Sequence, residues 1–398
     1  MLRAALLSSV LLAFASPVSA QVVVHEVPLS RPFDFGQYLS RDGSTVVGVL
    51  ASGMAGRWRP NTGLVEMGGF LPIGIDAGGN VACGVPLDTT QSVDAYRWSA
   101  FDGVLPIAPP KGFDRCSMYA VSGGLFGGSL VVGGVQHAAS WSSFSGFRAI
   151  TVSPGATWSA AVDVSQNQVV AGNWQDSAYR FGSFWSFGSY TQLLQGPGGS
   201  QCWIWSCSPM GNYFVGTVPI PGDPYSFVPG IPHRACVWSP GNGVSVLPML
   251  ANTQRADARA TSEWGTVIVG TASGAGVGYR ATVWGAAQGP IDLTRYVQCR
   301  ATGVDPGTLT VAHAVSADGR VILASGANGR LYLITGFTLP EGPRSDLNSD
   351  GATDGYDLAT LLECWGSGST QCPADLNADG FVNADDLTIL LARWGSCP

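Results

Sequence analysis

Short apolar segments alternate with polar turns along most of the chain, and the alternation itself repeats. Each repeat runs through a strand of small residues, a polar turn that often contains Gly, a Val-rich strand, a variable loop, a strand that holds Trp and a last apolar strand. Residues 38–48 (YLSRDGSTVVG) and 314–324 (AVSADGRVILA) begin the first and last repeats. Short apolar strands between glycine turns predict a mostly β body with few long helices.

Two markers count these repeats: a small residue that ends the second strand, and an aromatic anchor in the strand after it. The small residues are Gly48, Gly84, Gly133, Gly172, Gly216, Gly270 and Ala324. The aromatic residues are Trp58, Trp98, Trp141, Trp185, Trp238, Trp284 and Tyr332. Seven repeats of about 45 residues fit the four-stranded blades of a propeller, and one aromatic residue per repeat fits a packing role. We therefore predict a seven-bladed β-propeller over residues 21–338, with an open β solenoid or sandwich as the alternative.

The last repeat lacks a final strand, because residues 340–343 (PEGP) follow the apolar segment 331–335 almost at once. Residues 22–27 (VVVHEV) resemble such a final strand placed before the first repeat. A strand from the amino terminus that completes the last blade closes the ring and removes two open sheet edges. We expect residues 22–27 to pair with residues 331–335.

The first twenty residues predict export. Arg3 precedes an apolar run from Ala4 to Ala15, and small residues occupy the positions before residue 21. This pattern is typical of a cleaved signal peptide at residues 1–20, with an uncleaved anchor as the alternative. No later segment reaches the roughly eighteen apolar residues of a membrane-spanning helix. We expect a secreted protein, extracellular or at the cell surface.

Nine cysteines in an exported chain predict disulfides, since the compartment is oxidising. Cys202 and Cys207 are close enough in sequence to bridge locally, while Cys364, Cys372 and Cys397 lie together near the end. The connectivity stays open. A zinc site is disfavoured because no C-x-x-C pair occurs.

The acidity of the chain, with a net charge of -7, is confined to its last segment. Residues 346–398 hold nine acidic residues against one base, Arg393, whereas the rest of the mature chain has 18 acids and 18 bases. A body with equal numbers of acidic and basic residues lacks the clustered Lys and Arg that nucleic acid binding requires.

Two twelve-residue segments, 346–357 and 375–386, carry the most specific chemical signal. Each places oxygen-bearing side chains at positions 1, 3, 5, 9 and 12 and Gly at position 6. Calcium takes six to eight oxygen ligands, and the sharp bend at position 6 requires Gly, so the spacing predicts two calcium ions, one in each loop. Position 12 is Asp where ordinary EF-hands use Glu. The predicted ligands, with a backbone carbonyl at position 7, are Asp346, Asn348, Asp350, Ala352, Asp354 and Asp357, and Asp375, Asn377, Asp379, Phe381, Asn383 and Asp386.

Each loop leads into one amphipathic segment with near-helical spacing, residues 358–365 and 387–394. Paired loop–helix units 29 residues apart resemble a type I dockerin. The CPADLN segment that starts at Cys372 and the WGSC segment that starts at Trp394 are most similar to carboxy-terminal dockerins of planctomycete secreted proteins.

The resemblance implies a calcium-folded, EF-hand-like α-helical module at residues 346–398, after a linker at residues 339–345. It implies a cohesin-like or cell-envelope partner, with contacts near loop positions 10 and 11. Those positions are Gly355, Tyr356, Ala384 and Asp385. The plainer alternative is that calcium only folds the module and nothing binds to it.

The S-x-D-G-x-V-V-x-G and Trp pattern of the body also resembles the HAF-type repeats of secreted bacterial proteins, over roughly residues 30–338. That resemblance implies a secreted, propeller-like body and brings no established chemistry. Asp42 and Asp318 lie in Asp-Gly turns, where the side chain stabilises the turn.

No catalytic residue stands out. The four His fall in different repeats, and no catalytic or phosphate-binding motif occurs. The acids at or near strands are Glu26, Glu66, Glu263, Asp76, Asp163, Asp257 and Asp292, and nothing selects a pair of them. We expect a noncatalytic binding or display protein whose propeller face takes a polysaccharide or protein ligand. The alternative is a dockerin-borne carbohydrate-active enzyme, a glycoside hydrolase or lyase with a propeller catalytic domain.

Overall fold

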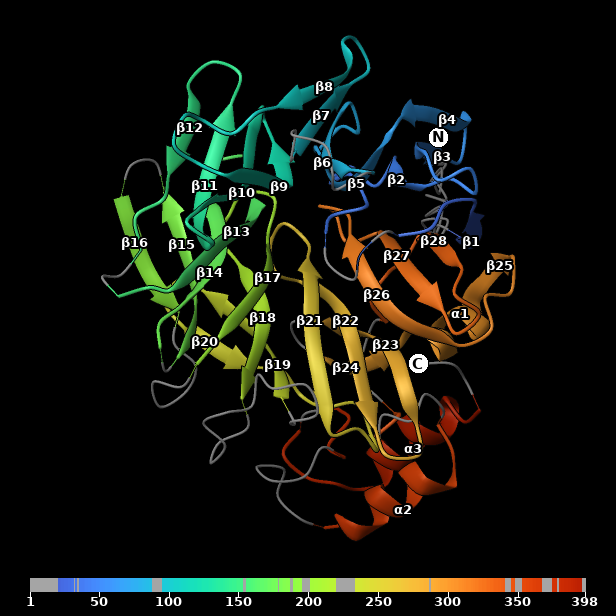
Figure 1. The fold of residues 1–398 in the computed structure, drawn as a ribbon. Helices are drawn as coiled ribbons and strands as arrows, with labels where there is room; N and C mark the ends of the chain where they lie inside the picture. Colours follow the sequence, from blue (N-terminus) through green and yellow to red (C-terminus); the bar gives the residue numbers. More distant parts are fainter. Residues whose placement is uncertain are drawn as a thin grey trace, which may run out of the picture.

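The computed structural model describes most of the chain after the predicted signal peptide, which itself lies outside the described residues. The described residues are 21–31, 33, 36–87, 95–152, 155–177, 179–186, 189–194, 201–219, 233–285, 288–340, 345–347, 353–366, 374–377 and 379–395. Seven sheets in this part of the chain surround a common axis, and a small helical module lies at one side of the ring (Figure 1). The predicted seven-bladed propeller with a helical tail module is confirmed.

The blades follow one another in chain order. Blade 1 contains β2 (Val46–Val49), β3 (Ala55–Arg59) and β4 (Gly63–Gly68), and blade 2 contains β5 (Phe70–Ile75), β6 (Val81–Pro86), β7 (Ala95–Ser99) and β8 (Gly103–Ile107). Blade 3 contains β9 (Arg115–Ser122), β10 (Leu125–Val132), β11 (Val135–Ser142) and β12 (Gly146–Ala149), and blade 4 contains β13 (Trp158–Val164), β14 (Val170–Gln175), β15 (Arg180–Ser186) and β16 (Ser189–Leu194). Blade 5 contains β17 (Trp203–Cys207), β18 (Phe214–Pro219), β19 (His233–Ser239) and β20 (Gly243–Val246), and blade 6 contains β21 (Arg255–Thr261), β22 (Val267–Gly274), β23 (Gly278–Gly285) and β24 (Gln288–Asp292). Blade 7 contains β26 (Leu309–Val315), β27 (Val321–Gly326), β28 (Leu331–Thr335), β1 (Val22–Val27) and, outside β1, β25 (Ala301–Gly303).

The amino-terminal strand closes the ring, as the sequence predicted. Strand β1 pairs antiparallel with β28, so that Val24 lies opposite Ile334, and the short β25 pairs parallel with its other edge. Val24 is buried in the core of blade 7. Closure joins the two ends of the body in one sheet, which leaves no exposed edge between the first and last blades.

Helix α1 (Leu293–Arg300) connects blade 6 to blade 7. Asp292 caps its first turn by accepting hydrogen bonds from the backbone N–H groups of Thr294 and Arg295, which satisfies donors that the first turn leaves open. Two further helices, α2 (Gly355–Glu363) and α3 (Ala384–Ala392), form the tail module. None of the described helices combines the length and the apolar character that crossing a membrane requires.

The aromatic residues that recur once in each repeat have the packing role that the sequence predicted. In blades 2 to 7 each of them lies on the third strand, and in blade 1 Trp58 lies on β3, the middle of the three strands. Most of them are buried, with Trp284 only 1% exposed. Trp141 contacts Phe126 edge to face, with ring centroids 5.1 Å apart. These rings fill the space between neighbouring sheets, so they stabilise the propeller and do not line its axis.

The repeated glycine has a cause that the sequence did not reveal. In blades 2 to 7 the register between the first two strands shifts at a β-bulge. The bulge pushes a carbonyl oxygen of the first strand against the second strand: a Cβ atom on Gly216 would lie 1.8 Å from the carbonyl oxygen of Trp203, and one on Gly270 would lie 1.9 Å from that of Asp257. Only Gly fits at these two positions, whereas blade 7 has the same bulge and carries Ala324 at the equivalent position.

One marker glycine was assigned wrongly. Gly133 lies in the exposed turn between β10 and β11 with φ +56°, and a Cβ there would meet nothing. The equivalent residue of blade 3 is Gly128, where a Cβ would lie 1.9 Å from the carbonyl oxygen of Ser117. The strands of blade 3 are long. Gly133, in the turn after β10, therefore falls at the spacing where the repeat led us to expect the marker glycine.

The turns after the first strands are built as predicted. The carboxylate of Asp42 accepts hydrogen bonds from the Ser40 hydroxyl at 2.6 Å and from the backbone N–H of Ser44 at 2.9 Å. Asp318 does the same with Ser316 and Arg320, at 2.6 and 3.0 Å. The S-x-D-G motif therefore stabilises turns.

The local bridge between Cys202 and Cys207 that the sequence allowed does not form. Both thiols are free and buried, at the two ends of the extended segment that contains β17. Five residues of extended chain span about 16 Å, far beyond the roughly 7 Å limit between bridged Cα atoms. The Sγ atom of Cys202 instead lies 3.9 Å from that of Cys236. Disulfides do occur in the chain, since Cys299 and Cys364 are each disulfide-bonded.

Candidate functional site

The second predicted calcium loop turns its oxygen atoms inward. The carboxylate of Asp375 accepts the backbone N–H groups of Asp379 and Gly380, at 3.1 and 2.9 Å, and the side-chain oxygen of Asn377 accepts that of Asp379 at 2.9 Å. Gly380 has φ +96°, the left-handed conformation that position 6 requires. The backbone N–H of Phe381 and then the side chain of Asn377 lower the pKa of Asp379. The side-chain oxygens of this loop therefore accept hydrogen bonds from the loop's own backbone.

The position-12 carboxylates are buried and tie each loop to its helix. Asp386 accepts backbone N–H groups of Leu376 at 2.6 Å and Asn383 at 2.8 Å. In the first loop, Asp357 accepts those of Leu347 at 2.7 Å and Asp354 at 2.8 Å. Neither carboxylate is exposed to solvent.

The predicted ligands at positions 9 and 12 also cap the helices. Asp354 and Asn383 are the N-cap residues of α2 and α3, and each forms a capping box with the position-12 Asp. The helices therefore begin at loop position 10, three residues before the predicted starts at Leu358 and Leu387, and they end two residues before the predicted ends. The apolar periodicity located the helices, but their boundaries follow the caps.

The first loop is described at Asp346, Asp354 and Asp357, while the predicted ligands Asn348, Asp350 and Ala352 lie outside the described residues. Among the described residues no three His, Cys, Asp or Glu side chains converge as a metal cluster. The second loop contains three described carboxylates, which do not converge in this structure, and two Asn side chains. A set made only of oxygen donors, with buried carboxylates at position 12, fits a hard cation such as calcium.

The two loop–helix units exchange matching backbone hydrogen bonds. The N–H of Gly366, after α2, donates to the carbonyl of Val382 at 2.9 Å, and that of Gly395, after α3, donates to the carbonyl of Thr353 at 2.8 Å. Between the units lies a small shared core made of Leu361, Ala374, Leu376, Val382 and Leu390. The duplication is therefore structural, and neither unit buries its apolar face without the other.

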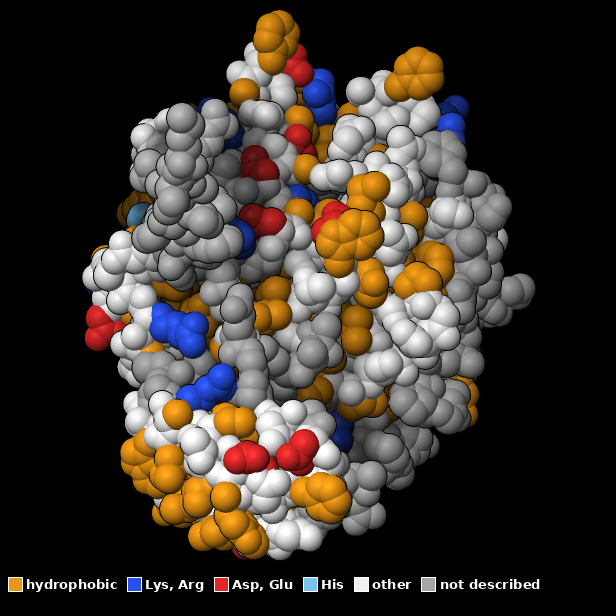
Figure 2. All heavy atoms as spheres, turned by 180° about the vertical axis from the view of Figure 1, so that it is seen from behind, with side chains coloured by type: hydrophobic (Ala, Val, Ile, Leu, Met, Phe, Trp, Pro, Cys, Tyr) orange, Lys and Arg blue, Asp and Glu red, His pale blue; other side chains and the backbone are white. Residues whose placement is uncertain are grey.

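The module also exposes large apolar side chains in matching pairs. Leu362 and Trp365 of the first unit are 52% and 46% exposed, and Leu391 and Trp394 of the second are 51% and 46% exposed. Figure 2 shows hydrophobic side chains gathered at the end of the molecule where the module lies. Monomeric proteins seldom expose such side chains in groups unless a partner covers them.

The four residues at loop positions 10 and 11 are exposed on the first turns of α2 and α3, with Tyr356 at 74%. The sequence-based prediction missed the Leu and Trp pairs toward the ends of the helices. Their recurrence after 29 residues was the available signal, but helical periodicity alone does not tell an exposed apolar residue from a buried one.

Five of the acids of the body form structural contacts. Asp163 lies 2.8 Å from Arg41, and Asp257 lies 3.0 Å from His233. Glu26 pairs with Arg330 at 2.7 Å on the surface, and Asp292 caps α1. Asp76 accepts backbone N–H groups in the turn before β6.

Residues 344–393 match the family model described as Dockerin type I domain. A type I dockerin domain therefore lies at the carboxyl end of this chain, as the loop spacing indicated. Domains of this type bind calcium and dock to cohesin-like partners, and they are typically extracellular or cell-surface modules. No curated protein sequence matches the chain.

Solved structures resemble the chain in fold. An oligogalacturonate lyase from Vibrio parahaemolyticus aligns over 80% of this chain and 94% of its own, with 11% identity and a TM-score of 0.53. An oligogalacturonate lyase in complex with manganese aligns over 80% and 91%, with 12% identity and a TM-score of 0.50. TolB from Acinetobacter baumannii aligns over 71% of this chain and 59% of its own, with 12% identity and a TM-score of 0.41.

At identities this low, the two lyase structures show a shared fold and no more. The lyase activity does not transfer with the fold, because chemistry depends on particular side chains. The alternative of a propeller-borne carbohydrate-active enzyme is therefore not favoured.

Proposed function

We propose that this chain is a secreted, noncatalytic binding or display protein that its tail attaches to a cohesin-like or cell-surface partner when calcium is bound. The body is the propeller of residues 21–338, and the docking module occupies residues 346–398 beyond a linker at residues 339–345. The observation that carries the proposal is the duplicated module, with capped loops of oxygen ligands and matching exposed apolar pairs.

Calcium has a defined place in this proposal. One ion in each loop, held by the side chains at positions 1, 3, 5, 9 and 12 and the carbonyl at position 7, would neutralise the clustered carboxylates. The buried position-12 carboxylates, Asp357 and Asp386, link the loops to α2 and α3 through the capping boxes. Loading of the loops therefore stabilises the helices that present the docking surface.

The docking surface in this proposal combines two sets of residues. Gly355, Tyr356, Ala384 and Asp385 are exposed on the first turns, and the apolar pairs Leu362 with Trp365 and Leu391 with Trp394 are exposed further along. Large apolar and aromatic side chains supply most of the binding energy of protein interfaces when a partner buries them.

Capture of the full-length chain on immobilised cohesin domains tests the proposal. We expect retention in calcium and release in excess chelator. The double variant Asp350→Ala, Asp379→Ala removes one carboxylate from each loop without touching a helix cap, and we expect it to lose retention. Glu363→Ala is the matched control, because it removes an exposed acid of α2 that lies outside the loops.

A second pair of variants tests the proposed docking surface. The pair Leu391→Ser, Trp394→Ser should weaken capture about tenfold or more, whereas Phe144→Ser, at a fully exposed aromatic residue of the propeller, should leave it unchanged. Undiminished capture in chelator, or equal loss with Phe144→Ser, would contradict the proposal.

A further inference from the structure

Helix α1 departs from the four-stranded plan of the blades and carries a paired cysteine. It lies between β24 of blade 6 and β25 of blade 7, and it is the one helix in the described part of the propeller. Cys299, in its last turn, is exposed and disulfide-bonded. The five cysteines that are free thiols, by contrast, are all buried.

The partner of Cys299 follows from the other cysteines. The chain has nine, and the five free thiols are Cys83, Cys116, Cys202, Cys207 and Cys236. The cysteines that remain as partners are Cys364, Cys372 and Cys397, of which the last two lie outside the described residues. All three belong to the tail, residues 346–398. Whichever of them bonds to Cys299, the disulfide joins the propeller to the docking module.

Helix α1 is held firmly against the body. The hydroxyl of Thr294 accepts the backbone N–H of Leu309 in β26 at 2.9 Å and donates to the carbonyl of the same residue at 3.3 Å. Leu293, Tyr296 and Val297 are buried in the core that blades 6 and 7 share. A bond to Cys299 is therefore a bond to a fixed part of the propeller.

The linker to the tail starts from the same helix. The hydroxyl of Tyr296 donates to the carbonyl of Thr338 at 2.8 Å and accepts its backbone N–H at 3.2 Å. The rings of Tyr296 and Phe337 are almost fully buried, with centroids 4.7 Å apart. Cys299 follows Tyr296 by three residues, so the two occupy neighbouring positions on the helix, roughly 5–6 Å apart. The backbone and the disulfide therefore connect the propeller to the tail from within one turn of α1.

Two connections constrain the module where one would not. Domains joined by a single linker reorient against each other unless a large interface holds them. Residues 339–345, fully extended, span roughly 25 Å. A disulfide holds the Cα atoms of its two cysteines within about 7 Å of each other. The second connection therefore removes most of the freedom of the linker, and it persists when the linker is cut.

The chemistry of this bond requires an oxidising compartment, as the proposed secretion supplies. Closing the bond takes two protons and two electrons from the paired thiols, and a disulfide oxidant of that compartment accepts them and becomes two thiols. The exposed position of Cys299 is open to such an oxidant, whereas the five free thiols are buried. Burial also raises the pKa of the Cys83 and Cys207 thiols, which keeps them in the unreactive protonated form.

We propose that the disulfide of Cys299 clamps the docking module to helix α1, so that a partner that holds the module also holds the propeller in one orientation. The clamp deepens the proposed display function and rests on its docking step. It makes the attachment of the propeller independent of an intact linker and sensitive to reduction.

A tryptic peptide map tests the bond itself. Cys299 falls in peptide 296–300, and the tail cysteines fall in peptides 345–393 and 394–398. In the full-length protein, alkylated and digested without reduction, we expect peptide 296–300 only in covalent linkage to a tail peptide. Dithiothreitol should release it, as the disulfide becomes two thiols and the reagent becomes a cyclic disulfide. Recovery of alkylated peptide 296–300 before reduction, or its linkage to a peptide of the propeller, would overturn the proposal.

Cutting the linker tests what the clamp does. A site-specific protease sequence inserted after Glu341 allows cleavage while the protein is bound to immobilised cohesin in calcium, and a reducing gel measures the cut. We expect the cut propeller to stay bound. Dithiothreitol, or the variant Cys299→Ser, should increase its release about tenfold or more. Gln298→Ser is the matched control, because it changes the exposed neighbour of Cys299 on α1.

X-ray scattering from the uncut proteins tests the orientation. Cys299→Ser should increase the maximum dimension by up to about 25 Å, the extended length of the linker, and Gln298→Ser should leave it unchanged. Equal release of the cut propeller from the unaltered protein and from Cys299→Ser, or equal dimensions of the two, would contradict the clamp.

The clamp and the docking function fail in different ways. Uncut Cys299→Ser should still be captured by cohesin in calcium, which shows that its module folds. If the unaltered protein is not captured, the docking proposal is wrong. The clamp is then still measured by the peptide map and by a nonreducing gel of the cut protein, in which the two fragments should migrate together.

Discussion

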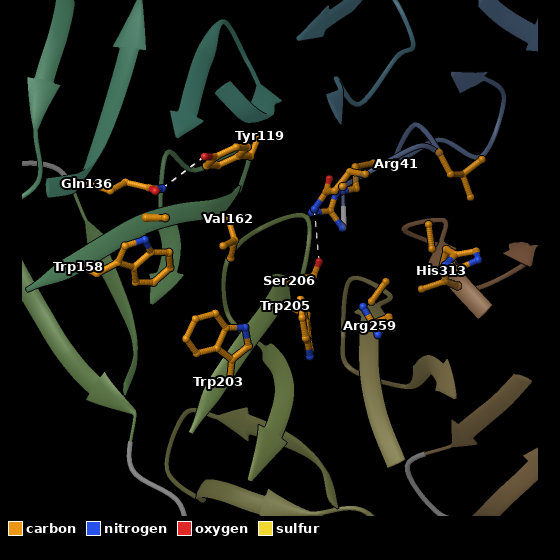
Figure 3. A pocket seen from close by; sticks show the side chains of 17 residues that line it. Arg41, Tyr119, Gln136, Trp158, Val162, Trp203, Trp205, Ser206, Arg259 and His313 are labelled. Atoms are coloured by element: carbon orange, nitrogen blue, oxygen red, sulfur yellow. Dashed lines mark hydrogen bonds between the residues drawn. The ribbon is translucent and has the colours of Figure 1, made fainter. Parts of the chain in front are cut away.

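At the residue scale, the body is organised by small residues at fixed places in each blade. The repeated glycines were visible in the sequence, but Gly84, Gly172, Gly216 and Gly270 lie inside the second strands and do not end them as expected. The structure supplies the cause of the repeat, a carbonyl oxygen pushed by the bulge into the space of a Cβ atom. In five blades the residue at this bulge, as Tyr119, Trp205 and His313 illustrate, lines a cavity near the propeller axis (Figure 3).

Gly216→Ala should destabilise the propeller by about 1–3 kcal/mol or more, because the added methyl carbon would lie 1.8 Å from the carbonyl oxygen of Trp203. The midpoint of urea unfolding measures the change. Gly69→Ala is the matched control, since its nearest neighbours are flexible side-chain atoms 3.7 Å away. Equal midpoints for the two variants would show that the bulge does not require glycine.

At the element scale, the loops and helices of the tail module share residues. Position 9 is at once a predicted calcium ligand and an N-cap, and position 12 is both a predicted ligand and the second half of the capping box. The helices α2 and α3 have only nine residues each, which is too short for stability on their own. Their order therefore depends on the loops.

Removal of calcium should release α2 and α3 while the propeller stays folded. Without the ion the clustered carboxylates repel one another, and the capping boxes lose the loops that hold them. Amide hydrogen exchange measures the effect: protection should fall by at least about tenfold in residues 355–363 and 384–392 and stay constant in the blades. Unchanged protection of both helices in excess chelator would argue against a calcium-dependent module.

At the scale of the whole molecule, a buried polar network joins blades that are distant in sequence. Arg41 in the turn before β2, Asp163 of β13 and Ser206 of β17 meet near the propeller axis. The side chains of Arg41 and Asp163 are 8% and 0% exposed, so this ion pair is screened far less than the exposed pair of Glu26 and Arg330.

Arg41→Met should cost about 3–5 kcal/mol of unfolding free energy, because it leaves the buried carboxylate of Asp163 without its cation. Adding Asp163→Asn should recover part of the loss, and a double-mutant cycle in denaturant measures the coupling. Arg330→Met removes the exposed pair with Glu26 and should cost no more than about 1 kcal/mol. A similar loss for the two arginines would mean that the axial network does not join the blades.

The sequence by itself determined the number of blades, the closing role of residues 22–27, the packing role of the aromatic series and the two loops of the tail, because each depends on short spacings that repeat along the chain. Only the tertiary structure decided which side chains meet on the axis, which carboxylates are neutralised, which cysteines stay apart and which apolar residues of α2 and α3 remain exposed. Such contacts join residues far apart in sequence, as Arg41 and Asp163 do, and a local pattern does not specify them. The bulge lies between the two cases. In five of the six blades with a described bulge a serine stands three residues after the bulge residue, but only the paired strands show which residue the register skips.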